Sequence, residues 1–150
     1  MNTRKPLTWL MSALVGVTLS ANAQADDRTL IEMPAPMQEH LLGNMRDHLH
    51  ALDDILAALA EGDAATAGKI AEARLGLSSL DDHGAAHMAP FMPDGMRNAG
   101  TELHRAASRF SQAAMNADVE HTFEAQQSVF AALQNITASC NACHDGYRIR

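Results

Sequence analysis

Apolar residues recur along most of the chain at alternating spacings of three and four, the pattern of amphipathic helices. We expect a first helix over 36–61, a second over 64–80, a third over 95–116 and a fourth over 119–147. The inward face of the first is predicted to contain Leu41, Met45, His48, Leu52, Ile55 and Leu59. No segment shows the alternation of apolar and polar residues that marks a half-buried strand.

The residues between these segments fit helix ends. Asp63, Asp94 and Asp118 are predicted N-caps of the second, third and fourth helices, because a short acidic side chain can accept from the free N–H groups of a first turn. The connection 81–95 contains two prolines and two glycines and is expected to be irregular. The predicted inward stripe of the fourth helix includes Phe123, Phe130, Leu133, Cys140 and His144. Four such helices joined mostly by short loops predict an all-α, antiparallel four-helix bundle.

The first 23 residues have the pattern of a secretory signal peptide. Arg4 and Lys5 precede an apolar stretch over 7–19, and Ala21-Asn22-Ala23 offers a small-x-small cleavage site. The apolar stretch is too short to span a bilayer well. We therefore predict export to the periplasm, a flexible lead-in over 24–34 and one helical domain over 35–150.

Composition narrows the possible functions of the exported chain. Without residues 1–23 it has nine Lys and Arg against 18 Asp and Glu, a net charge of −9. This balance argues against nucleic-acid binding, which depends on basic contacts to phosphate. The exported chain has 25 Ala but only four Phe and one Tyr. A core so poor in large side chains suggests that a bound group fills part of it.

The only two cysteines form the motif Cys140-Asn141-Ala142-Cys143-His144, the attachment signature of haem c. Residues three and four apart share one face of a helix. Both thiols could thus reach the two vinyl groups of one porphyrin, with the His144 imidazole placed to bind its iron. A disulfide within one helical turn would stabilise little, because the loop it closes is tiny. A thioredoxin-like dithiol would require a βαβ setting that this sequence lacks.

The segment from Cys140 through Tyr147 and Arg148 resembles the tail of class II c-type cytochromes, the family of cytochrome c-prime and its low-spin relatives. The resemblance is sharp at this tail and in part of the first helix. It implies a four-helix bundle with one covalent haem on the last helix. It also implies His144 as the proximal iron ligand and Arg148 near the haem edge.

The sixth iron ligand decides between two functions. Met45, on the inward face of the first helix, is the predicted ligand, and low-spin relatives similarly place a Met early in that helix. Met37 and His48 are alternatives. A Met/His pair would make the chain an electron carrier whose acidic surface attracts basic redox partners. An open distal side would instead favour binding of NO or CO, as in cytochrome c-prime.

Other His and Met residues allow a further alternative. The connection and the residue that follows it supply His83, His87, Met88, Met92 and Met96, and imidazole and thioether groups together suit copper. The competing interpretation is that these residues pack over the end of the bundle. The remaining histidines are expected at solvent-facing positions or helix edges: His40, His50, His104 and His121. No catalytic constellation stands out, so we do not predict an enzyme. A homodimer remains open.

Overall fold

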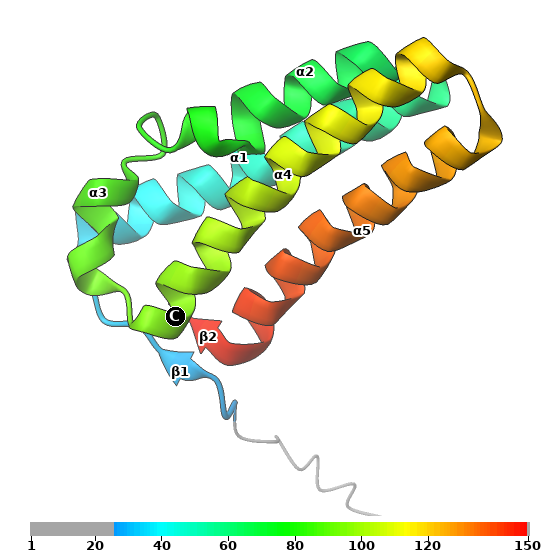
Figure 1. The fold of residues 1–150 in the computed structure, drawn as a ribbon. Helices are drawn as coiled ribbons and strands as arrows, with labels where there is room; N and C mark the ends of the chain where they lie inside the picture. The colour runs from blue at the N-terminus through cyan, green and yellow to red at the C-terminus, as the bar shows by residue number, and fades with distance from the viewer. Residues whose placement is uncertain (1–25, 150) are drawn as a thin grey trace, which may run out of the picture.

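The computed structural model describes residues 26–149, and these residues are almost entirely helical (Figure 1). The long helices are α1 (Ala35–Ala60), α2 (Ala64–Leu75), α4 (Asp94–Glu120) and α5 (Phe123–Gly146). Short turns of helix join α2 to α4: η1 (Leu77–Ser79), α3 (Ala85–Met88) and η2 (Ala89–Phe91). Helix α1 packs on α2, α2 on α4, and α4 on α5, whereas α1 and α5 are not among the closely packed pairs. This packing confirms the all-helical prediction and is compatible with a bundle.

Three helix boundaries differ from the predicted ones by four or five residues: the end of α2, the end of α4 and the start of α5. Helix α2 stops at Leu75, five residues early, because Gly76 takes an extended conformation and the chain re-enters as η1. The Ser78 hydroxyl donates to the Glu72 carbonyl at 2.7 Å, which satisfies an acceptor at the end of the helix. Asp118 does not cap the last helix, because α4 continues through it to Glu120.

The observed caps use side-chain oxygens as predicted, one at the expected residue and one at a different residue. The Asp63 carboxylate accepts from the Thr66 N–H at 2.8 Å, as predicted for the start of α2. The Thr122 hydroxyl performs this role for α5, accepting from Ala125 at 3.1 Å. Asp94 is the first residue of α4 rather than its cap, and its carboxylate pairs with Arg97 in the same turn.

The larger core lies between the long helices and is built mostly from alanine around Phe110 and Ile55. Its small side chains allow close helix approach. A Cβ added at Gly68 on α2 would lie 3.1 Å from both the Ala114 Cβ and the Ser111 carbonyl oxygen on α4. The alanine content is therefore largely explained by tight packing between helices.

A second apolar cluster occupies the other end of the molecule and is rich in methionine. Its buried members are Ile31, Met33, Leu41, Met88 and Met96, with Met37, Met45, Met92, Cys143, Tyr147 and Ile149 packed against them. We call this set the methionine cluster. Methionine is flexible and polarizable, so it fills irregular space without fixing one tight arrangement.

The lead-in, expected to be flexible, is tied to the C-terminus in its described part. Strand β1 (Thr29–Leu30) pairs in parallel with β2 (Tyr147–Arg148), and the Ile31 N–H donates to the Arg148 carbonyl at 2.8 Å. Ile31 and Met33 then enter the methionine cluster. The lead-in therefore closes the end of the molecule where α5 ends (Figure 1).

No helix within residues 26–149 is both long and apolar enough to cross a membrane. The predicted signal peptide, residues 1–23, lies outside the described residues.

Candidate functional site

The two cysteines lie one turn apart near the end of α5. Neither is in a disulfide, and both are half-buried. Cys140 packs against the alanine-rich core, whereas Cys143 packs against the methionine cluster. Burial raises the pKa of both thiols. The pair thus presents two protonated, partly accessible sulfur atoms on one helix face at the junction of the two apolar regions.

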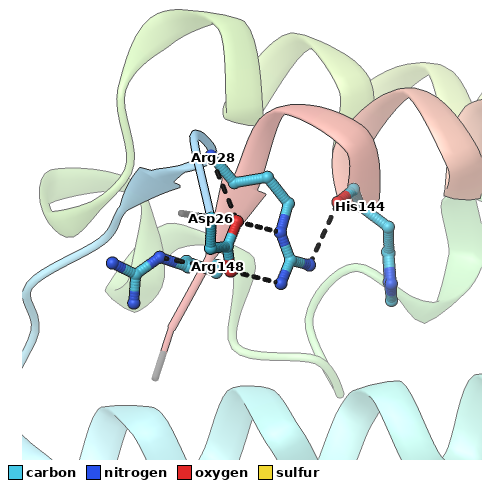
Figure 2. Close-up of polar contacts among 4 residues, drawn as sticks. All are labelled: Asp26, Arg28, His144 and Arg148. Carbon is cyan, nitrogen blue, oxygen red and sulfur yellow. Dashed lines mark hydrogen bonds and ion pairs between the residues drawn. The ribbon is translucent and has the colours of Figure 1, made fainter. Parts of the chain in front are cut away.

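His144 follows on the same turn, with its side chain exposed. Its backbone carbonyl accepts from the Arg28 guanidinium at 3.4 Å. Figure 2 shows the imidazole pointing away from the polar group formed by Asp26, Arg28 and Arg148. The lead-in therefore holds the backbone of this turn without engaging the His144 ring.

Arg148 makes a different contact from the one expected at a haem edge. Its Nε lies 3.5 Å from the Asp26 carboxylate, on the side of the chain away from the His144 ring (Figure 2). Arg28 binds the same carboxylate at 2.7 Å and lowers the pKa of Asp26 to about 2, chiefly through this hydrogen bond. In this structure Arg148 joins the C-terminus to the lead-in.

The three candidate sixth ligands occupy two different environments. Met37 and Met45 are half-buried and pack against the methionine cluster, which Cys143 also contacts. His48, one turn after Met45, is 8% exposed and lies against the rings of His83 and His104. The two methionines therefore share an apolar region with the haem motif, and His48 is engaged elsewhere.

Two large apolar side chains are left uncovered in the first turns of α5. Phe123 and Phe130 belong to the predicted inward stripe, yet they are 71% and 59% exposed. The buried positions of α5 are instead Ala125, Val129 and Ile136. The prediction identified an apolar face correctly but wrongly assumed that another helix covers it.

Helix α1 also presents uncovered apolar residues. Leu49 and Leu56 are 68% and 51% exposed, and they continue the helical spacing that begins at Met45. Because α1 and α5 are not closely packed, neither helix buries the stripe of the other. Large apolar side chains exposed on a helix are typical of a surface that a further group covers.

The His and Met residues of the 83–96 connection do not gather into one site. Met88 and Met96 are buried in the methionine cluster, Met92 packs beside them, and His87 is exposed. His83 turns instead toward His48 and His104. Within residues 26–149, no three His, Cys, Asp or Glu side chains already have the arrangement of a metal site. Met88, Met92 and Met96 thus pack over the end of the bundle, as the packing interpretation expects.

Sequence reasoning missed the grouping of three histidines from distant segments. His48 lies on α1, His83 in the connection and His104 on α4, where it was expected at an exposed position but is 7% exposed. The signal available in the sequence was the position of His48 on the predicted inward face of the first helix. We call these residues the histidine cluster.

A groove of about 360 Å³ lies elsewhere, between α4 and α5. It is lined by Ala99, Glu102, Arg109, Asn135, Ala138, Ser139 and Ala142. The groove is lined by neither cysteine, and Glu102 pairs with Arg109 along its α4 side. It offers no chemistry connected with the haem motif.

Comparisons with known proteins add no assignment: no protein-family model, curated protein or solved structure matches the chain.

Proposed function

We propose that this chain is a periplasmic monohaem c-type cytochrome that carries single electrons. Haem c would be attached to Cys140 and Cys143, with His144 and Met45 as axial iron ligands in an antiparallel four-helix bundle. When bound, the haem supplies an iron centre that takes up and releases one electron. Export rests on the signal sequence in residues 1–23.

The observation that carries the proposal is the state of the Cys-x-x-Cys-His turn. Both thiols are unpaired and partly accessible, and the His144 side chain is exposed. These are the properties that attachment of a porphyrin through two thioethers would need. The lead-in supports this turn by pairing β1 with β2 and by the contact of Arg28 with the His144 carbonyl.

The uncovered apolar stripes support a location for the macrocycle between α1 and α5. A haem seated there would shield Leu49 on α1 and the α5 face that continues from Cys140 toward Phe130. Burial of such surface contributes roughly 25 cal/mol per Å², so a covalent haem would also add to the stability of the fold. The same location faces the methionine cluster, from which Met45 would reach the iron.

The choice of Met45 over His48 rests on their surroundings. Met45 shares the methionine cluster with Cys143, and His48 lies against two other imidazoles. A thioether ligand opposite a histidine raises the reduction potential of a haem. With its acidic surface, the protein would then pass electrons to partners that present basic patches, at rates that fall as salt rises.

The test is the visible spectrum of the oxidised, purified protein and of two matched methionine variants. We expect a low-spin spectrum with a methionine-to-iron band in the native protein and in Met37→Ala. Met45→Ala should become high-spin and lose that band. The two positions lie on the same helix and contact the same cluster, so Met37→Ala controls for loss of packing.

Two results would contradict the proposal in different ways. A native protein that is already high-spin, and that binds carbon monoxide rapidly once reduced, would indicate a gas-binding cytochrome instead. A protein purified without haem from a host that attaches haem c would contradict the cytochrome assignment as a whole.

A further inference from the structure

The histidine cluster brings three imidazoles together in the interior of the fold. The ring centroids of His48 and His83 are 4.8 Å apart, those of His83 and His104 are 5.3 Å apart, and those of His48 and His104 are 6.2 Å apart. A tetrahedral ion with metal–nitrogen bonds of 2.0–2.1 Å would hold the centroids of its imidazole ligands about 5 Å apart. The spacing of these rings is therefore close to that of a three-histidine metal site.

Hydrogen bonding fixes the proton on one of the rings. The His104 Nδ1 lies 2.8 Å from the Leu75 carbonyl oxygen, and a carbonyl can only accept. Nδ1 must then carry the proton, which leaves Nε2 with a free lone pair in the neutral ring. A backbone carbonyl that orients a histidine in this way is the usual outer partner of a metal-binding imidazole.

The other two rings also have nitrogen atoms available. The His83 Nδ1 lies 3.5 Å from the Ser79 hydroxyl, which itself donates to the Gly76 carbonyl at 2.8 Å. The His48 Nε2 is buried and has no hydrogen-bond partner. Leaving a buried polar nitrogen unpaired is costly, about 1–3 kcal/mol, so this atom requires an explanation.

We propose that the histidine cluster is a binding site for one borderline divalent metal ion of the zinc or copper type, held by His48, His83 and His104. The ion would satisfy the unpaired His48 nitrogen and join α1, α4 and the connection. Its site is separate from the Cys-x-x-Cys-His turn and does not depend on haem. Binding would require the rings to rotate so that one nitrogen of each points toward a common centre, because no three His, Cys, Asp or Glu side chains within residues 26–149 could hold a metal ion as they stand.

The surroundings favour the neutral imidazoles that a metal requires. Burial, followed by the nearby His83 and His104, lowers the pKa of His48 to about 4. Burial is also the main cause that lowers the pKa of His83. Imidazole nitrogen ligands suit zinc, copper and nickel rather than calcium or magnesium, which prefer oxygen ligands.

Zinc titration of the full exported chain tests the site. We expect one Zn²⁺ per chain by calorimetry at pH 7.5, and a zinc-edge absorption spectrum dominated by imidazole nitrogen at about 2.0–2.1 Å. His104→Gln and His83→Asn should each weaken binding by more than about tenfold, since even outer-shell changes have effects of 10–100-fold. His83 is half-buried, which makes His83→Asn the milder change should His104→Gln fail to fold.

Two exposed histidines provide matched controls. His50→Gln lies two residues beyond His48 on α1, and His87→Asn lies four residues beyond His83 in the connection. Both variants should bind zinc as the native protein does. Equal loss of binding in controls and cluster variants would overturn the proposal, as would unaltered binding in His83→Asn. A sulfur shell at about 2.3 Å would place the ion at the cysteines and also overturn it.

Discussion

The contact between α2 and α4 and the relation between α1 and α5 differ sharply. On the first side, small residues let the helices approach so closely that Gly68 has little room for even a Cβ beside Ala114. On the second side, Leu49 and Phe130 remain exposed although both helices carry apolar stripes. The contact between α2 and α4 is therefore closely packed, whereas apolar side chains on α1 and α5 stay exposed because no helix covers them.

The α2–α4 contact and the exposed residues of α1 and α5 therefore have different roles. The α2–α4 interface supplies stability through close packing, which is sensitive to changes of a single methylene. Helix α5 also carries Cys140, Cys143 and His144 near its end, where the two cysteines contact the two apolar regions and His144 is exposed. If haem is attached to the cysteines, as we propose, it would cover apolar surface that the helices leave exposed.

The largest expected effect concerns the core of the α2–α4 side. Phe110 is fully buried, so Phe110→Ala should lower the free energy of unfolding by about 3–5 kcal/mol through lost burial and a new cavity. Urea denaturation of the haem-free protein measures this. Phe130→Ala is the control and should cost less than about 0.5 kcal/mol, because Phe130 is largely exposed. Equal losses of unfolding free energy in the two variants would contradict the difference between the α2–α4 contact and the exposed face of α5.

A somewhat smaller effect should appear on acidification. The pKa of a histidine in the unfolded chain is about 6.5, whereas burial lowers the pKa of His48 in the folded protein to about 4. Between these two pH values the unfolded state therefore binds more protons than the folded state. Stability should therefore fall by about 3 kcal/mol as pH drops across this window.

Urea midpoints between pH 7 and 4, with a chelator present, measure the loss of stability. The slope should be reduced in His48→Gln and retained in His50→Gln, whose side chain is exposed. The same slope in both variants would show that the buried ring is not its source.

The smallest effect tests the closeness of α2 to α4. Gly68→Leu should cost about 1–3 kcal/mol, because the added atoms meet Ala114 and the backbone at Ser111. Gly100→Leu on α4 is the matched control, since a Cβ there meets nothing within 4 Å. Thermal unfolding compares the two. If Gly68→Leu is the more stable variant, the interface is looser than described.

Periodicity predicted most of the fold because the helices are amphipathic along most of their length. It extended the second helix to residue 80 because Leu77 and Leu80 continue the apolar spacing, whereas Gly76 in fact leaves the helix. It also placed Phe123 and Phe130 inward, since a pattern identifies an apolar face but not what covers it.

The candidate site could be predicted from the sequence only where its residues are neighbours in the chain. Cys140, Cys143 and His144 lie within five residues, so helical spacing alone puts them together. His48, His83 and His104 come from three segments, and only the fold brings their rings into contact. The pairing of β1 with β2 likewise joins residues too few and too distant in the chain to produce a pattern.

The intact mass of the protein, purified from a bacterial periplasm equipped for haem c attachment, tests the central claim most directly. The account predicts a chain without residues 1–23 and heavier by one haem that survives denaturation. Cys140→Ser combined with Cys143→Ser should lack the added mass. A native protein with the bare polypeptide mass, or that mass less two hydrogens for a disulfide, would contradict it.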